Sequence, residues 1–300
     1  MDQIAQGAAT DTAVAEYPAP ALTRLPTSLL DLTADMSFVA RFRLAAQDVR
    51  DGLRLWRLAA TLGWLDIRLR YRGSMLGPFW LTLSTGVMVG ALGFLYSSLF
   101  VMDLRSYLPF LTLSLVLWNC LSASVGEACL CFTEAEGVIR SVRLPYTLHP
   151  LRCLVRNGLV LLHNIGVVVV VFAIFEIWPG PLALLAIPAA MLWVVDGIAA
   201  ALLFGAVCAR FRDVPPIVGS VMQIAFFVSA IIWKPEQIGG RPVWLQGNPF
   251  FSIIEIVRAP ILGDVPSHLT YASALGWSAL LCAAAAVVFA RARGRLAFWV

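Results

Sequence analysis

Six long apolar runs, separated by shorter charged segments, set the pattern of the chain. The runs cover 73–102, 106–126, 157–175, 177–209, 214–233 and 265–290, and only the fourth contains a charged residue, Asp196. A helix that crosses the hydrocarbon core of a bilayer needs about 20 predominantly apolar residues. The pattern therefore predicts six transmembrane helices, at about 77–102, 107–131, 151–177, 182–209, 217–233 and 271–290.

Leucines recur at steps of three and four residues just before the first run, which places them on one stripe of a helix over 51–73. Arginines flank this stripe, and the candidates for contact with lipid headgroups are Arg54, Arg57, Arg68, Arg70 and Arg72. We predict an amphipathic helix in the membrane plane, with leucines in the acyl region and arginines at the headgroups. A cytosolic helix packed on a partner is the alternative.

The segment 234–270, between the fifth and sixth runs, combines many prolines and glycines with one short apolar stretch, 250–257. That stretch is too short to cross a bilayer. We expect short re-entrant or interfacial helices there, on the outer side of the membrane.

Arginines fall almost entirely on alternate sides of the predicted spans. Of the 22 lysines and arginines, 18 lie on one side and 4 on the other. Because positive charge near helix ends stays in the cytoplasm, we predict that both termini are cytoplasmic. The net charge of +4 follows from this asymmetry and gives no sign of a nucleic-acid partner.

Composition favours one membrane domain with a cytosolic arm. The chain is 60% hydrophobic and 13% charged, and six spans leave little for a separate soluble domain. Residues 1–37 have neither a basic n-region nor an apolar h-region, so we expect a flexible cytosolic tail rather than a secretory signal. The expected organisation is a tail over 1–37, an interfacial helix region over 38–73 and an all-α six-span domain over 74–300.

Motifs for catalysis are absent from the sequence. The one lysine, Lys234, lies between Trp233 and Pro235 and cannot belong to a phosphate-binding loop. The three histidines lie in separate segments, without metal-ligand spacing, and the six cysteines fall in or beside apolar runs, as buried thiols do. We therefore expect no catalytic residue, metal or cofactor in this chain.

Among the ionisable residues inside predicted spans, the candidates are Glu127, His163 and Asp196. Such groups are functional candidates, since burying them in a membrane is costly. The depths of Asp196 and His163 along their helices differ by roughly 8 Å, so we expect a structural hydrogen bond between them. A proton relay in a carrier is the alternative.

Four strings occur in order along the chain: "DIRLRYRGSMLGPFW" at 66–80, "VIRSVRLPYTLHPL" at 138–151, "RFRDVPPIV" at 210–218, and "NPF" at 248–250, the last followed by Arg258. Together with the six runs they resemble the ABC-2 type permeases that export polysaccharides and polyol phosphates, such as capsule, O-antigen and teichoic acid. The resemblance covers about 53–293. The chain departs from that pattern in its long tail and its low lysine content.

This resemblance implies partners that the sequence alone does not. It implies a half-transporter that pairs with a second copy and with two copies of a separate ATPase, which binds ATP and Mg. It implies that 51–71 is a gate helix. It also implies that 134–143 is a coupling helix seated on the ATPase, with Glu134, Glu136, Arg140 and Arg143 as the contact candidates.

In such permeases the first and fifth spans line the channel. Sugar rings stack on aromatic side chains, and the channel candidates are Phe79, Trp80, Phe94, Tyr96, Phe100, Phe226, Phe227 and Trp233. The alternative is an ordinary belt of aromatic residues at the membrane interfaces.

The sequence thus leads to one functional hypothesis with three rivals. We predict the permease subunit of an ABC exporter of a lipid-linked polysaccharide in a bacterial inner membrane. The rivals are an ABC-2 permease for drugs or lipids, a proton-coupled carrier, and an integral membrane transferase.

Overall fold

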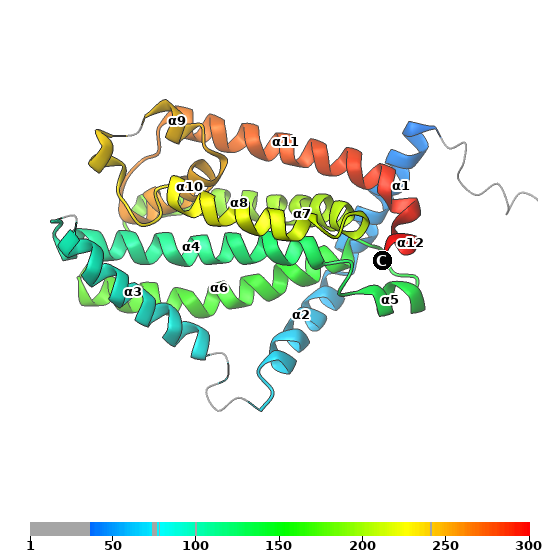
Figure 1. Cartoon of the computed structure of the whole chain (residues 1–300), viewed down its shortest axis with the longest axis horizontal. Coiled ribbons are helices and arrows are strands. Elements are labelled where there is room, and N and C mark those ends of the chain that lie inside the picture. The colour runs from blue at the N-terminus through cyan, green and yellow to red at the C-terminus, as the bar shows by residue number, and fades with distance from the viewer. Residues whose placement is uncertain (1–36, 74–76, 78, 100, 241) are drawn as a thin grey trace, which may run out of the picture. The chain divides into compact units, whose positions relative to one another are not determined.

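The computed structural model describes residues 37–73, 77, 79–99, 101–240 and 242–300, and every regular element in these residues is a helix (Figure 1). The predicted tail over 1–37 lies outside the described residues except for its last position. The helices all belong to one compact unit, from Ser37 to Val300.

Each of the six predicted spans corresponds to a helix. They are α3 (Phe79–Leu99), α4 (Leu104–Leu130), α6 (Leu148–Ile174), α7 (Ala186–Arg210), α8 (Val214–Val228) and α11 (His268–Ala292). A short 3₁₀ helix, η2 (Pro181–Leu185), leads into α7. Five of these helices are long and apolar enough to cross a membrane, and α8 is not, because it has 15 residues.

The predicted fifth span, 217–233, is wrong at its carboxyl end. Helix α8 ends at Val228, and Ala230 has a φ of 51°, a left-handed conformation that stops a helix. Polar atoms just after the helix bond to the distant segment 248–258. The Ala230 carbonyl accepts from Arg258 Nη1 at 2.8 Å, and Ser229 Oγ accepts from Asn248 Nδ2 at 3.1 Å. Trp233 therefore lies beyond α8 and not on it.

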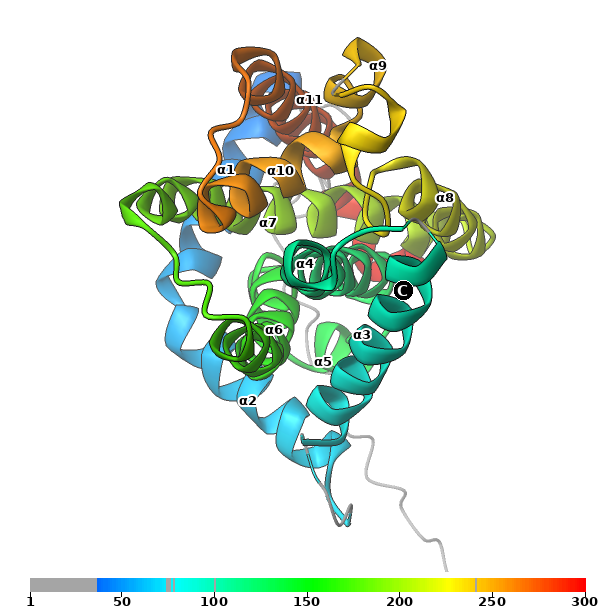
Figure 2. The ribbon, with the colours of Figure 1, turned by 90° about the vertical axis from the view of Figure 1, so that its left-hand side faces the viewer.

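Helix α4 lies at the centre of the bundle. Figure 2, which looks along the helices, shows α4 surrounded by α3, α6, α7, α8 and α10, and it contacts each of them. Its first half, from Tyr107 to Trp118, is buried almost without interruption except at Leu108. A helix that is apolar and buried on all sides belongs in a core, and the main apolar cluster is built around this half of α4.

Short helices close one end of the bundle, which we call the far end. They are η3 (Pro235–Ile238), α9 (Val243–Gln246) and α10 (Pro249–Leu262). The predicted helix in 250–257 is therefore present. Asn248 caps α10 by accepting from the Phe250 and Phe251 amides, Gly263 ends it at a φ of 91°, and residues 251–260 are all buried. Its re-entrant placement in a membrane stays a prediction.

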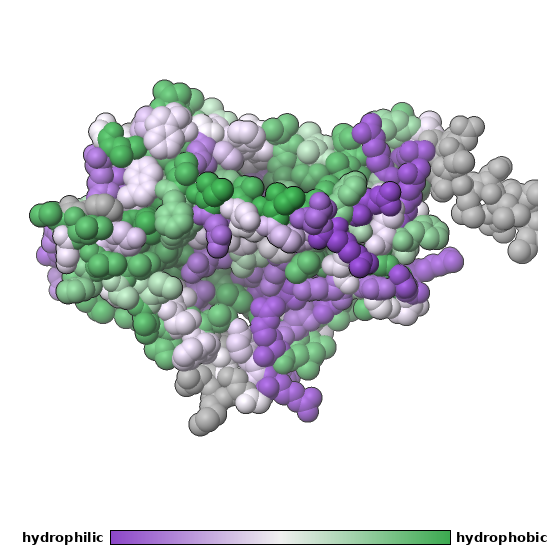
Figure 3. Space-filling model, viewed as in Figure 1, coloured by the Kyte–Doolittle hydropathy of each residue, from purple (hydrophilic) through white to green (hydrophobic). Residues whose placement is uncertain are grey.

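The opposite end, which we call the basic end, carries α1 (Phe38–Arg54), α2 (Trp56–Arg70), α5 (Glu136–Ser141), η4 (Arg293–Arg295) and α12 (Leu296–Trp299) (Figure 1). Hydrophilic residues gather on this end, whereas hydrophobic residues cover much of the surface over α3 and α8 (Figure 3). The two ends thus differ in polarity as the arginine distribution predicts.

Helix α2 packs on α6 through three residues spaced four apart, of which two are small. Ala59, Gly63 and Ile67 are its buried residues. A Cβ on Gly63 would lie 2.9 Å from Val155 Cγ1, so only glycine permits this approach. Much of the predicted leucine stripe, including Leu58, Leu65 and Leu69, is exposed, so these side chains are free to meet an apolar phase.

Candidate functional site

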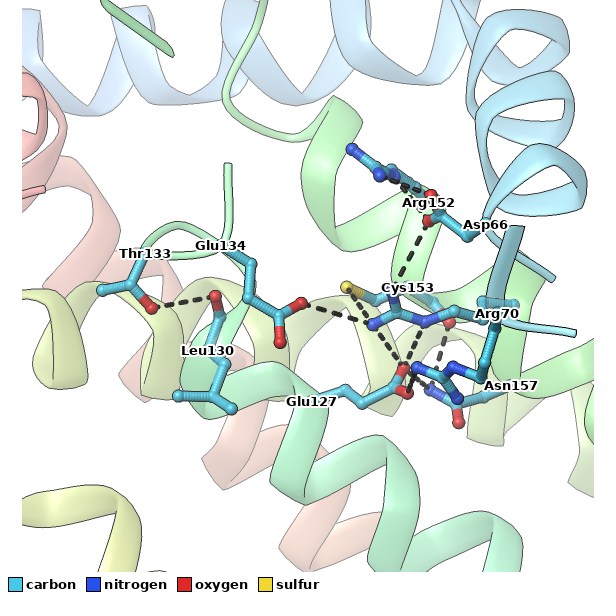
Figure 4. Close-up of polar contacts among 10 residues, drawn as sticks. Asp66, Arg70, Glu127, Leu130, Thr133, Glu134, Arg152, Cys153 and Asn157 are labelled. Atoms are coloured by element: carbon cyan, nitrogen blue, oxygen red, sulfur yellow. Dashed lines mark hydrogen bonds and ion pairs between the residues drawn. The ribbon is translucent and has the colours of Figure 1, made fainter. Parts of the chain in front are cut away.

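A cluster of paired charges joins α2 to the bundle at the basic end. We call it the arginine network, and its charged members are Asp66, Arg70, Glu127, Glu134, Arg152 and Arg156 (Figure 4). Asp66 and Arg70 come from α2, Glu127 from the last turn of α4, Glu134 from the segment before α5, and the two remaining arginines from the first turns of α6.

Asp66 and Arg152 form the tightest pair in the network. Arg152 Nε lies 2.6 Å and Nη2 2.5 Å from the two Asp66 carboxylate oxygens, which is a bidentate arrangement. Such pairs add geometric specificity to charge. The partners are 86 residues apart in sequence, so this contact holds α2 in one register on α6.

Arg156 is the hub of the network. Its Nε donates to Glu127 Oε2 at 2.9 Å, its Nη1 lies 3.4 Å from Asp66 Oδ2, and its Nη2 lies 3.7 Å from Glu134 Oε2. The side chain is only 8% exposed. One buried guanidinium therefore contacts carboxylates of three separate segments.

Glu127 has two further donors. Asn157 Nδ2 donates to its Oε2 at 2.7 Å, and Arg70 Nη2 donates to its Oε1 at 3.4 Å. The network thus sets three carboxylates against three guanidinium groups. A buried charge is tolerated only when it is paired and hydrogen-bonded, and this balance meets that condition.

Helix α5 lies within the predicted coupling segment 134–143 and is exposed. Glu136 and Arg140 form an ion pair at 3.0 Å along it, and both side chains are about half exposed. Glu134 and Arg143 flank the helix and are also exposed. The four residues predicted to contact a partner are therefore accessible, and Glu134 also belongs to the arginine network.

A hollow of about 750 Å³ adjoins α5, lined by residues of α1, the segment 139–149, Arg293 and Ala297. Within it, the buried carboxylate of Asp48 accepts from the Tyr146 amide (3.2 Å), from the Thr147 amide (3.0 Å) and from Arg293 Nε (3.1 Å). Burial raises the pKa of the Tyr146 hydroxyl, an effect that nearby Arg293 partly opposes. This second polar cluster ties α1 to the start of α6 and to the end of α11.

The remaining gate-helix candidates are exposed on α1, α2 and the turn after them. Arg54 lies 3.7 Å from Asp51, and the Arg57 guanidinium lies over the Trp56 ring at 5.6 Å. Arg68 and Arg72 are exposed. Their accessibility suits headgroup contact, which stays a prediction.

Aromatic residues gather beside a groove of about 690 Å³ between α4 and α8. Phe226 and Phe227 line it, as does Trp118 of α4, whose ring centroid is 5.7 Å from that of Phe226. Trp118 was not among the predicted channel residues, because a tryptophan inside an apolar span gives no signal of facing a groove. The groove places two of the predicted residues together with one unexpected partner.

The other predicted channel residues are more scattered. Phe79, Trp80 and Phe94 are exposed on α3. Tyr96 and Trp233 pack against the main apolar cluster and are partly buried. Phe100 lies outside the described residues. Figure 2 shows α3 and α8 on the same flank of α4, so the exposed aromatic residues of both helices belong to one side of the bundle.

The expected hydrogen bond between Asp196 and His163 is wrong. Asp196 Oδ2 accepts from Ser278 Oγ at 2.7 Å, and His163 Nδ1 donates to the Leu159 carbonyl at 2.7 Å. Glu127 lies inside α4, as expected for a residue of the second span, but in its last turn, where it belongs to the arginine network. These separate partners give no support to a relay through the three groups.

A buried pair in α10 was missed altogether. Arg258, 1% exposed, donates through Nη2 to Glu255 Oε2 at 2.6 Å and through Nη1 to Ser114 Oγ at 2.7 Å. Its guanidinium lies over the Phe110 ring at 4.3 Å. Opposite charges three residues apart in an otherwise apolar helix are the sequence signal for such a pair.

No group of three or more potential metal ligands lies together in the part of the chain that the structure describes.

Comparison with known proteins decides the family. The model for the ABC-2 type transporter matches residues 57–262. The chain belongs to this family. An ABC-2 protein is the membrane component of a transporter, so this chain is a multi-pass membrane permease and not itself the catalyst. The matched segment runs from α2 to the end of α10, and so contains the arginine network and the α4–α8 groove.

Relatives of this ABC-2 protein include O-antigen export permeases. The chain is 24% identical over 201 residues to the O-antigen export system permease protein RfbA of Myxococcus xanthus, covering 65% of this chain and 76% of that one. It is 24% identical over 191 residues to the RfbA permease of Klebsiella pneumoniae, covering 63% and 74%. The predicted resemblance to an ABC-2 permease is confirmed.

Proposed function

We propose that two copies of this chain, with two copies of a separate ATPase that binds ATP and Mg, export a lipid-linked polysaccharide across a bacterial inner membrane. The observation that carries this proposal is the arginine network, which connects the amphipathic helix α2 to the segment that leads into exposed α5. Membership of the ABC-2 family supports a role in a transporter, and the names of the relatives favour a glycan cargo.

The ATPase contact is assigned to α5 and the hollow beside it. A short helix with exposed charges of both signs gives a partner specificity and register more than affinity. Glu134 lies next to this helix and 3.7 Å from Arg156 Nη2. Arg156 in turn contacts Asp66 of α2. A displacement of α5 by the ATPase thus reaches α2 through two ion pairs.

The glycan path is assigned to the flank that carries α3 and α8. The groove beside Trp118, Phe226 and Phe227 is open on one protomer, and a second copy facing it encloses a path. Aromatic side chains stack on the apolar faces of sugar rings without holding them by charge. Such a surface suits a long neutral or weakly charged polymer that must slide.

The decisive experiment deletes the gene and follows labelled sugar into surface glycan and into lipid-linked glycan of the inner membrane. We expect surface glycan to be lost and lipid-linked glycan to accumulate, with recovery on complementation by the intact chain. Unchanged surface glycan without accumulation would contradict a glycan cargo and favour export of drugs or lipids. Copurification of an ATPase with the tagged chain tests the partner separately.

A further inference from the structure

A second cavity, of about 460 Å³, lies inside the bundle between α4, α6, α7, α10 and α11. It shares no lining residue with the α4–α8 groove or with the hollow beside α5. The proposed export path leaves it without a role. Its position among apolar helices makes it a candidate binding site in its own right.

The wall of this cavity is mostly apolar, with Leu121, Leu161 and Phe204 among its lining residues. Trp193 and Trp277 also line it, and their indole N–H groups already donate to backbone carbonyls of Ile253 and Gly247, at 2.8 and 2.9 Å. Both tryptophans therefore offer ring surface rather than a free donor. Ligand sites typically combine such walls with a few polar groups.

Asp196 supplies the acidic group, and Ser124, Asn157 and Ser278 are the other hydroxyl and amide side chains among the lining residues. Asp196 Oδ2 accepts from Ser278 Oγ, whereas Asp196 Oδ1 is buried and meets no hydrogen-bond partner among the residues that the structure describes. The described lining includes no lysine, arginine or histidine. A buried oxygen that lacks a partner is costly, and a carboxylate gains most from a charged donor. A ligand with a hydrogen-bond donor can therefore supply the partner that Asp196 Oδ1 lacks.

The size and opening of the cavity limit which ligands can bind there. A cavity of about 150 Å³ holds one benzene ring, so 460 Å³ has room for roughly three times as many carbon atoms, on the order of eighteen. Gly158 of α6 and Ala190 and Val194 of α7 line the cavity and are exposed. The cavity thus opens on the apolar surface of two membrane-spanning helices, where a ligand arrives from the hydrocarbon phase.

We propose that this cavity binds a single-chain amphiphile whose head group donates a hydrogen bond, with a primary ammonium preferred. The chain lies along the wall formed by α4, α6 and α7, and the head group donates to Asp196 Oδ1. A long-chain alcohol shares this chemistry without the charge. The site is distinct from the export path and does not depend on the identity of the exported cargo.

The test uses the full chain in lipid nanodiscs and a hexadecylamine that carries a photoreactive diazirine on its alkyl chain. Peptide mapping is expected to place the label on cavity-lining segments of α4, α6 and α7. Unlabelled hexadecylamine should compete best, hexadecanol less, and palmitate, whose carboxylate faces that of Asp196, least. Equal competition by palmitate and hexadecylamine would overturn the assignment.

Two glycines of α6 provide a matched pair of variants. A Cβ added to Gly158 or to Gly166 meets nothing within 4 Å, and only Gly158 lines the cavity. Gly158→Leu fills the opening and should abolish labelling, while Gly166→Leu, with the same gain in helix propensity, should label as the wild type does. Equal labelling of the two variants would show binding to the outer surface instead.

Asp196→Asn tests the head-group contact. Loss of a charge-assisted hydrogen bond should weaken competition by hexadecylamine about tenfold, with hexadecanol changed much less. An unchanged preference for the amine in this variant would refute the role of Asp196. Since Asn keeps the shape of the side chain, a wild-type elution profile by size exclusion is the control for folding.

Discussion

The two ends of the bundle each bury a guanidinium group, but they use it differently. At the far end, Arg258 is paired with Glu255 of its own helix and is fully enclosed, with a further hydroxyl and carbonyl as acceptors. At the basic end, Arg156 shares the carboxylates of three segments. The first pair fixes α10 in a single arrangement. The second contacts α2, α4 and the segment before α5 at once, which is the arrangement that the proposed coupling between α5 and α2 needs.

Removing Arg258 should have the largest effect on stability. Arg258→Ala leaves Glu255 charged and buried, and breaking a buried pair in this way costs about 3–5 kcal/mol. We expect a large loss of folded protein in detergent, measured by thermal unfolding. The double variant Glu255→Gln with Arg258→Met should recover most of that loss. Equal stability of Arg258→Ala and the wild type would refute a stabilising role for the Arg258–Glu255 pair at the far end.

Removing Arg156 should affect coupling more than folding. Arg156→Ala loses charge-assisted hydrogen bonds that contribute about 2 kcal/mol, but Arg152 and Arg70 still neutralise Asp66 and Glu127 in part. We expect a folded protein whose partner ATPase hydrolyses ATP while export falls at least tenfold. Arg156→Lys, which keeps the charge but loses the fork of donors, should be intermediate. Normal export in Arg156→Ala would show that transport does not depend on the arginine network.

Reversing the charges of α5 should leave the fold intact. Glu136 and Arg140 are exposed, and surface substitutions usually change stability by less than about 0.5 kcal/mol. Reversal of Glu134 also removes its ion pair with Arg156, so the triple reversal should insert with a modest loss of stability, and the double reversal of Glu136 and Arg140 should unfold as the wild type does. We expect the triple reversal to uncouple ATP hydrolysis from export in reconstituted vesicles. Normal export by the triple variant would refute α5 as the ATPase contact.

Truncating an aromatic residue of the groove should have the smallest effect. Phe227→Ala removes ring contacts that are worth about 0.5–1.5 kcal/mol, so we expect export to slow by roughly threefold to tenfold, with little change in stability because the side chain is 60% exposed. Tyr96→Ala is the matched control, since Tyr96 packs on the core and should lower stability instead. The opposite pattern would place the path elsewhere.

Hydropathy predicted the helices well and their contacts poorly. The six apolar runs gave six helices, and the leucine spacing predicted α2, although the helix predicted over 51–73 is interrupted at Leu55, where α1 ends. The end of α8 was missed because residues 229–233 remain apolar, while the residues that hold them out of the helix, Asn248 and Arg258, come from α10 and its cap. Periodicity within a segment contains no information about a donor from another segment.

The same limit applies to the candidate site. Asp66 and Arg152 are 86 residues apart, and no pattern in the sequence joins them, although each was visible as a charge near a helix end. The resemblance to a family implied that 51–71 is a gate helix and that 134–143 is a coupling helix. It did not predict that Arg156 joins them. Asp196 was singled out as a charge inside an apolar run and given the wrong partner, since depth along a helix does not tell which face a side chain occupies.

The early stop of α8 has a consequence for membrane thickness. At about 1.5 Å per residue, its 15 residues span about 22 Å, compared with about 30 Å for the hydrocarbon core. A bilayer meets a short apolar helix by thinning around it. If the proposed glycan path follows α8, the polymer crosses a narrower apolar layer there than the rest of the bilayer presents, and fewer of its sugar units lose their water at any one time.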